Sequence, residues 1–124
     1  MKLLKNPALI LLAILLTITI AACGGDPLQE AVDMINDDES MHEELEGLYT
    51  VRAEARGSST IVVIFRAEMI ELADPAVAEA VSESAESEFQ AALREMRNAR
   101  ISDPKILLEF QDMDGVLIYT HEFS

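Results

Sequence analysis

Apolar residues follow three different spacings along this chain. Residues 8–20 form a nearly continuous apolar run, in which only Thr17 and Thr19 are polar. From residue 28 onward, apolar positions either recur at steps of three and four or alternate with polar ones. Steps of three and four are typical of an amphipathic helix, and alternation is typical of a half-buried strand. The chain therefore divides into a leading apolar segment and a folded region of helices and strands.

Two stretches have the helical spacing. The first follows Asp26-Pro27, an N-cap residue and a first-turn proline, and resumes at Met41 and Leu45 after a break at residues 36–38. This pattern predicts one kinked helix. The second follows Asp74-Pro75, with glutamates early and arginines late, as the helix dipole favours. It predicts one long helix, whose apolar stripe consists of Val77, Val81, Ala85, Phe89, Ala92, Leu93 and Met96.

The remaining stretches predict four strands in two hairpins. Residues 49–56 and 60–69 are joined by a turn at 57–59, and residues 105–111 and 116–123 are joined by a turn at 112–115. Gly115 is free to take a positive φ in the second turn. The second and fourth strands carry apolar residues on both faces, which predicts interior positions in a sheet.

The element order α-β-β-α-β-β indicates an α+β fold, a four-stranded antiparallel sheet packed by one long and one kinked helix. Because the long helix has to run back across the sheet, the third strand should point in the same direction as the second. With strands two and four inside, the predicted spatial order is 1-2-4-3, in which all neighbours are antiparallel. The alternative order is 2-1-3-4.

One face of this predicted sheet lies under the long helix, and the other is also apolar. If the first helix covers that second face, its side chains are core, which is the interpretation we favour. If the first helix shares the side of the long helix, they form an exposed patch of the kind that marks partner surfaces. The residues concerned are Val62, Ile64, Leu107, Val116 and Ile118.

The leading segment has the pattern of a secretory signal. Lys2 and Lys5 precede the apolar run, which is shorter than the roughly 20 residues of a membrane-spanning helix. Its end resembles the bacterial lipobox, a branched apolar residue and two small ones before a cysteine: Ile20, Ala21, Ala22 and Cys23. That resemblance implies cleavage before Cys23 and a diacylglyceryl group on its thiol. We therefore expect a removed signal (1–22), a lipidated cysteine with a short tether (23–25) and one acidic domain (26–124).

Two acyl chains hold a protein stably on a membrane, so the expected location is the outer, extracytoplasmic face of the cell membrane. The precursor has a net charge of −14. Cleavage removes two of nine basic residues and none of the 23 acidic ones, which leaves −16. Such a charge repels nucleic-acid phosphates and anionic lipid head groups. A nucleic-acid partner is therefore not expected, and cations or a basic envelope protein are favoured electrostatically.

Few residues could carry chemistry. Asp112 and Asp114 echo the start of a calcium loop, but the chain turns at once into a strand, so a hairpin turn is favoured over a weak cation site. The only histidines, His42 and His121, are expected at surface or edge positions. The serines have no Gly-x-Ser-x-Gly context, and there is no glycine-rich phosphate loop. We expect no cofactor and no enzymatic activity.

The region after the signal resembles a family of small lipoproteins of Gram-positive bacteria, known only as a domain of unknown function. The matching features are an acidic first helix and the segments 23–25, 60–65, 103–106, 112–115 and 122–124. The resemblance implies a lipoprotein and names no catalytic residue. The expected function is a membrane-anchored binding or interaction module, and the alternative is a calcium-associated envelope protein. The sequence leaves the oligomeric state open.

Overall fold

The first helical segment is divided in two, as the sequence predicts. In the computed structural model, which describes residues 27–124 apart from the side chains of Ser40 and Met41, α2 (Pro27–Asp37) is followed by α3 (Glu39–Leu45). The break between them confirms the predicted kink. The apolar side of α2 is buried through Leu28, Ala31, Val32 and Ile35. The amphipathic spacing of α2 therefore places its apolar side against the sheet.

The second helical segment begins as expected but is not one helix. The Asp74 carboxylate accepts a hydrogen bond from the backbone N–H of Ala76 at 2.8 Å, and α4 (Pro75–Ser84) follows. The chain leaves helical geometry at Ala85 before α5 (Glu86–Asn98). The hydroxyls of Ser82 and Ser84 donate to carbonyls four residues earlier, at 2.9 and 2.8 Å. Such back-bonding bends helices, so the predicted single long helix is wrong at this point.

The four strands are β1 (Tyr49–Arg56), β2 (Thr60–Ala67), β3 (Lys105–Gln111) and β4 (Leu117–Phe123), and the single-turn helix η2 (Ile70–Leu72) follows β2. They form an α+β fold with a mixed sheet of order β1-β2-β3-β4. The pairs β1–β2 and β3–β4 are antiparallel, and β2–β3 is parallel. The predicted order 1-2-4-3, its alternative 2-1-3-4 and the all-antiparallel sheet are therefore wrong.

The error in strand order has a physical cause. The run Ile106-Leu107-Leu108 is apolar on both faces, as suits an interior strand, and β3 lies inside the sheet. The consecutive apolar residues of β4 instead coincide with a register shift against β3 at Phe110/Gln111. A bulge disturbs the alternation of side chains, and Leu117 remains 52% exposed. β4 is an edge strand.

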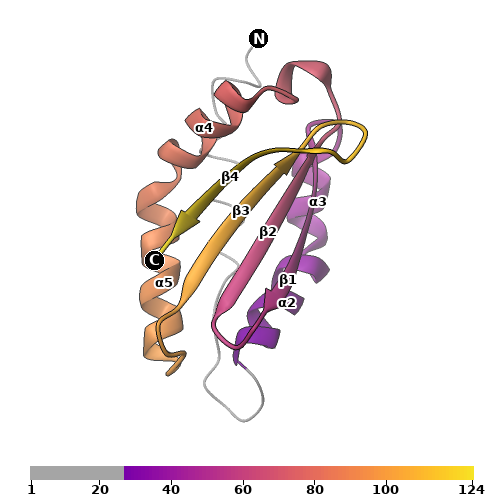
Figure 1. Cartoon of the computed structure of the whole chain (residues 1–124). Coiled ribbons are helices and arrows are strands. Elements are labelled where there is room, and N and C mark those ends of the chain that lie inside the picture. The colour runs from indigo at the N-terminus through magenta and orange to yellow at the C-terminus, as the bar shows by residue number, and fades with distance from the viewer. Residues whose placement is uncertain (1–26) are drawn as a thin grey trace.

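The hydrophobic core lies on the helix side of the sheet (Figure 1). α2 packs on β1 and touches β2, whereas α4 and α5 pack on β3 and β4. Phe65 and Phe110 stack with ring centroids 4.9 Å apart, and Tyr49 meets both edge-on. Because α2 shares the core with α4 and α5, the favoured interpretation that the first helix covers the Val62 face is wrong.

The edge of β1 is closed by a side chain from α2. The Asn36 amide donates to the carbonyl of Ala53 at 2.9 Å and accepts from its N–H at 2.7 Å. These two bonds occupy backbone groups that would otherwise be free to pair with another strand. They also fix the end of α2 beside the middle of β1, so α2 begins near the β1–β2 hairpin (Figure 1).

Candidate functional site

The sheet face opposite the core, which we call the open face, carries side chains from all four strands. None of the described helices packs on it, because their buried residues belong to the core on the other side. Pairing aligns Arg52, Ile64 and Glu109 in one row across β1, β2 and β3. The next row consists of Glu54, Val62 and Leu107. The open face therefore has an apolar centre between charged flanks.

The predicted partner residues are only partly brought together. Val62 and Ile64 lie on the open face, 0% and 3% exposed, and half-buried Leu107 is beside them. Val116 precedes β4 and is 58% exposed, and Ile118 packs against the helix-side core. The bulge in β4 separates these last two from the first three.

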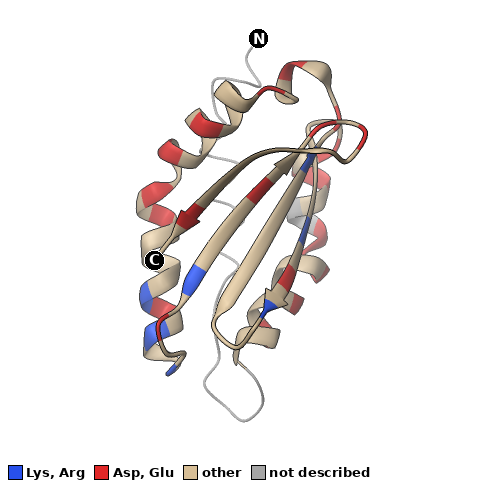
Figure 2. Ribbon diagram, in the orientation of Figure 1, with Lys and Arg blue, Asp and Glu red and all other residues tan. Residues whose placement is uncertain are grey.

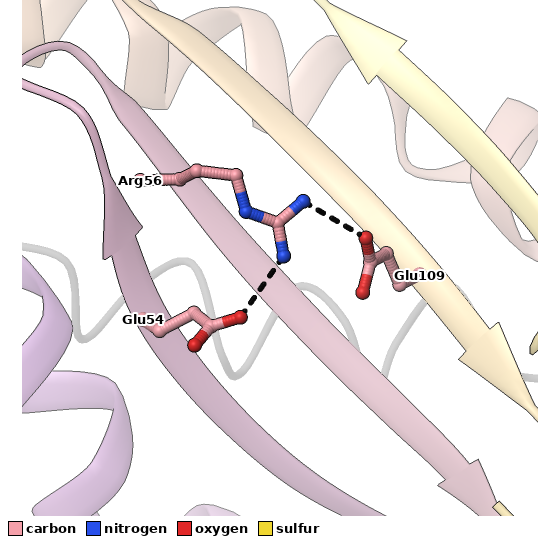
Figure 3. A network of polar contacts seen from close by, with 3 residues as sticks. All are labelled: Glu54, Arg56 and Glu109. Carbon is pink, nitrogen blue, oxygen red and sulfur yellow. Dashed lines mark hydrogen bonds and ion pairs between the residues drawn. The ribbon is translucent and has the colours of Figure 1, made fainter.

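An ion-pair network crosses the centre of the open face (Figure 3). Arg56 of β1 reaches over β2 and donates to Glu109 of β3 at 3.1 Å and to Glu54 at 3.0 Å. The hydrogen bond with Glu109 and then that with Glu54 raise the pKa of Arg56. The aliphatic part of an arginine can shield apolar surface while its head stays in water. Because Glu54 is opposite Val62 and Glu109 is opposite Ile64, the side chain of Arg56 spans β2 beside these two buried residues.

A cleft of about 600 Å³ opens at the other end of this face, where β1 begins and β2 and β3 end. Its lining combines two arginines, one glutamate and several apolar or neutral groups. The lining residues are Thr50, Arg52, Ile64, Arg66, Ala67, Glu68, Gln111 and Met113.

Two polar groups in the cleft are held in place. Arg66 donates from Nη2 and Nε to the carbonyl of Met113, at 2.8 and 3.3 Å, and so ties the β3–β4 hairpin to the end of β2. Glu68 accepts from the hydroxyl of Thr50 and from the N–H of Gly47, both at 2.9 Å. These contacts orient the cleft walls without neutralising the guanidinium of Arg66.

Arg52 is the third charged group of the cleft and differs from the other two. Its exposed side chain makes no hydrogen bond or ion pair within residues 27–124. With Arg66 bound to a neutral carbonyl, the cleft holds two guanidinium charges against one carboxylate. Guanidinium groups bind carboxylates and phosphates through paired N–H donors. The cleft can therefore accept an anionic group beside the apolar atoms of Ile64 and Met113.

The sequence analysis did not identify Arg52, Arg66, Gln111 or Met113 as site residues. One signal was present in the sequence. Side chains alternate between the two faces of a strand, and in the β1–β2 hairpin Arg52, Ile64 and Arg66 fall on the same face as Val62. The contribution of the β3–β4 hairpin had no such signal, because it depends on β3 pairing directly with β2.

The other sequence candidates are dispersed. Asp112 accepts from the N–H groups of Asp114 and Val116, both at 2.9 Å, and Gly115 takes φ of 84° as expected for this turn. His42, on α3, contacts the backbone carbonyl of Asn36 at the end of α2, whereas His121 lies beside Tyr119 on β4. Among residues 27–124, no group of three or more His, Cys, Asp or Glu side chains is placed to hold a metal ion.

Ile20, Ala21, Ala22 and Cys23 lie outside the described residues. Within residues 27–124, no helix has the length and apolar content needed to cross a membrane. Comparison of the chain with protein-family models, curated proteins and solved structures gave no match. The similarity to bacterial lipoproteins therefore rests on the residues described above.

Proposed function

We propose that this protein is a lipid-anchored, extracytoplasmic binding module that uses the cleft of the open face to hold a ligand with an anionic group and an apolar part. The anchor is supported by the lipobox-like residues that end at Cys23. The binding role is supported chiefly by Arg52, a guanidinium without a partner in the described chain, at the wall of a ligand-sized cleft. Pockets of several hundred Å³ with a few polar groups are typical of small-molecule sites.

A binding role fits the lining better than a catalytic one. Among the residues that the structure describes, no histidine or cysteine lines the cleft, and its carboxylate, Glu68, already accepts two hydrogen bonds. General-base catalysis needs a group free to take a proton near the substrate. The cleft instead offers fixed walls and donors, as a receptor for an anionic ligand requires.

Methyl NMR tests the binding role directly, because Ile64 and Met113 place methyl groups in the cleft wall. The processed protein in nanodiscs is titrated with phenylphosphate and, separately, with phenyltrimethylammonium. We expect phenylphosphate to shift both methyl signals in a saturable way and the cation to leave them unchanged. Arg52→Gln should weaken phenylphosphate binding about tenfold or more, because it removes a charge-assisted hydrogen-bond donor.

The matched control is Arg97→Gln, which also removes an exposed arginine but from α5, outside the cleft. It should leave phenylphosphate binding unchanged. Equal responses to the anion and the cation, or equal losses in both variants, would contradict the proposed site. The anchor is tested separately by mass spectrometry of the native protein, which should show a diacylglyceryl group on Cys23.

A further inference from the structure

The two edges of the sheet differ in how far the chain covers them. At the β1 edge, Asn36 occupies both backbone groups of Ala53, and α2 and α3 pack beside the strand. Within residues 27–124, no hydrogen bond joins the backbone of β4 to any element except β3. β4 contains no proline, lysine or arginine, residues that often prevent pairing at an edge. Its bulge affects only the start of the strand, so residues 119–123 form a regular, open edge.

The pairing of β3 shows which backbone groups of β4 are open. The N–H of Lys105 donates to the carbonyl of Ser59, so the odd-numbered residues of β3 direct their backbone groups toward β2 and the even-numbered ones toward β4. The even-numbered residues of β3 are paired with Phe123, His121 and Tyr119. Because successive residues of a strand direct N–H and C=O to opposite sides, Thr120 and Glu122 direct theirs away from the sheet. Each of them offers one donor and one acceptor to a further strand.

The surroundings of these open groups are acidic. Burial, and then the charges of Glu79 and Glu83 on α4, raise the pKa of Tyr119, which shows that both exposed carboxylates face β4. Glu122 is paired with Leu107 and therefore places its carboxylate on the open face. Carboxylates thus flank the β4 edge on both sides of the sheet.

Few cations offset these charges. α4 and β4 contain no lysine or arginine. The first arginine of α5, Arg94, is five residues after Phe89, whose ring stacks on Phe123 at the end of β4. Arg94 therefore lies about 7.5 Å farther along the helix axis, beyond the strand. Lys105 is the cation at the start of β3, so beside Thr120 and Glu122 three carboxylates stand against one cation.

We propose that the outer edge of β4 binds an extended, basic segment of a partner protein, which pairs with Thr120 and Glu122 as a further strand of the sheet. Strand addition provides main-chain hydrogen bonds, and side chains on alternate positions provide specificity. Basic side chains on the helix side of the added strand reach Glu79 and Glu83, and those on the other side reach Glu122. In Figure 1, α4 and α5 lie on the side of β4 away from β3, and both contact β4. They support the added strand from the helix side.

A second copy of this chain is the other strand that such an edge invites. Pairing two β4 edges would bring the Glu79, Glu83 and Glu122 carboxylates of both copies together, and like charges in contact destabilise the pairing. The same charges therefore deter self-association and favour a basic segment. This site is separate from the proposed cleft, to which β4 contributes no residue.

Hydrogen exchange measured by NMR tests strand addition, because it reports each backbone N–H of β4 separately. The full protein in phosphatidylcholine nanodiscs is mixed with an acetylated, amidated heptapeptide of alternating lysine and valine. At a peptide concentration about ten times its Kd, exchange of the Thr120 and Glu122 amides should slow about tenfold. The Tyr119 and His121 amides, which face β3, should change little.

Two further peptides serve as controls. Replacement of every lysine by glutamate keeps the backbone and reverses the charge. Methylation of every backbone nitrogen keeps the charge and removes the hydrogen-bond donors. Neither peptide should slow exchange at Thr120 or Glu122.

Charge variants of the protein test the acidic flank. Glu79→Gln with Glu83→Gln should weaken binding of the lysine peptide about fivefold, because each exposed ion pair contributes a modest amount. The matched control, Glu43→Gln with Glu44→Gln, removes the same charge from exposed positions of α3, which packs beside β1. It should leave binding unchanged.

The outcomes decide the proposal. Equal slowing by the lysine and glutamate peptides, or equal losses in the two charge variants, would overturn the basic partner. Slowing by the methylated peptide, or no slowing at millimolar lysine peptide, would overturn strand addition. Slowing at Thr120 and Glu122 that rises with protein concentration without any peptide would identify a second copy as the occupant and would also overturn the proposal.

Discussion

Apolar side chains are buried in different ways on the two faces of the sheet. On the helix side, aromatic and aliphatic side chains from β1, β2 and β3 pack against residues of the helices. On the open face, Val62 and Ile64 are equally inaccessible but belong to no helix-covered cluster. On this face the long charged side chain of Arg56 spans β2 and remains in contact with water. A buried residue in this protein is therefore not always a residue of the core.

The largest effect should come from removing an aromatic ring on the helix side. Phe65 is 1% exposed and stacks on Phe110. Phe65→Ala should lower the free energy of unfolding by about 3–5 kcal/mol, because it leaves a cavity that the neighbours cannot fill. Urea denaturation measures this, with the exposed Ile70→Ala as a control near zero. A loss below about 1 kcal/mol would show that this side is not a tightly packed core.

The next largest effect on stability should come from the hydroxyl group of Tyr49 on the helix side, and this effect depends on pH. Burial raises the pKa of Tyr49 from 10.0 to about 12. Below pH 10 both the folded and unfolded states keep the proton. Between pH 10 and about pH 12 only the unfolded state ionises, so stability should fall by roughly 2–3 kcal/mol. Tyr49→Phe should remove this part of the alkaline loss, as measured by thermal unfolding against pH.

The same variant should also be more stable at neutral pH. The Tyr49 hydroxyl is buried and has no hydrogen-bond partner in the described chain, so its removal should add about 1 kcal/mol while keeping the ring contacts. Tyr119→Phe serves as the control, since this tyrosine is only half-buried. An unchanged alkaline transition in Tyr49→Phe would contradict the assignment.

Substitution of two neighbouring valines on β2 allows the packing of the two faces to be compared directly. Val63 faces the helices and Val62 faces the open side, with exposures of 1% and 0%. Val63→Ala should cost about 2–3 kcal/mol, because its surroundings are rigid. Val62→Ala should cost about 1 kcal/mol, because the flexible side chains around it can close over the smaller residue. Equal losses in urea denaturation would mean that both faces are packed alike.

The smallest effect should come from the charged cover of the open face. A double-mutant cycle of Arg56→Gln and Glu109→Gln should give a coupling of about 0.2–1 kcal/mol, as is usual for exposed ion pairs. The coupling should disappear at high salt. A coupling above about 2 kcal/mol that persists in salt would show that this pair is a structural core element in its own right.

Local structure was largely predictable from the sequence, because it depends on neighbouring residues. Apolar spacing and the Asp-Pro starts located both helical segments, and the kink after α2 follows from the polar residues there. The break at Ala85 was missed because the serine back-bonds that bend the helix leave the apolar stripe intact. The turns and four strands were also predicted, with small differences at their ends.

The cleft was far less predictable. Its arginines lie on β1 and β2, a local hairpin, and their shared face could be deduced from alternation. Gln111 and Met113 join them only because β3 pairs with β2 in parallel. Strand order depends on which distant segments pair, and the two-faced apolar patterns of β3 and β4 did not by themselves distinguish the interior strand from the edge strand.

By itself, then, the sequence determined the element types, the acidic character of the chain and the lipobox-like residues at Cys23, all of which are properties of short segments or simple sums. Only the tertiary structure decided that α2 shares one face with α4 and α5 and that β3 lies inside the sheet. These features arise from long-range packing, in which residues far apart in the chain become neighbours.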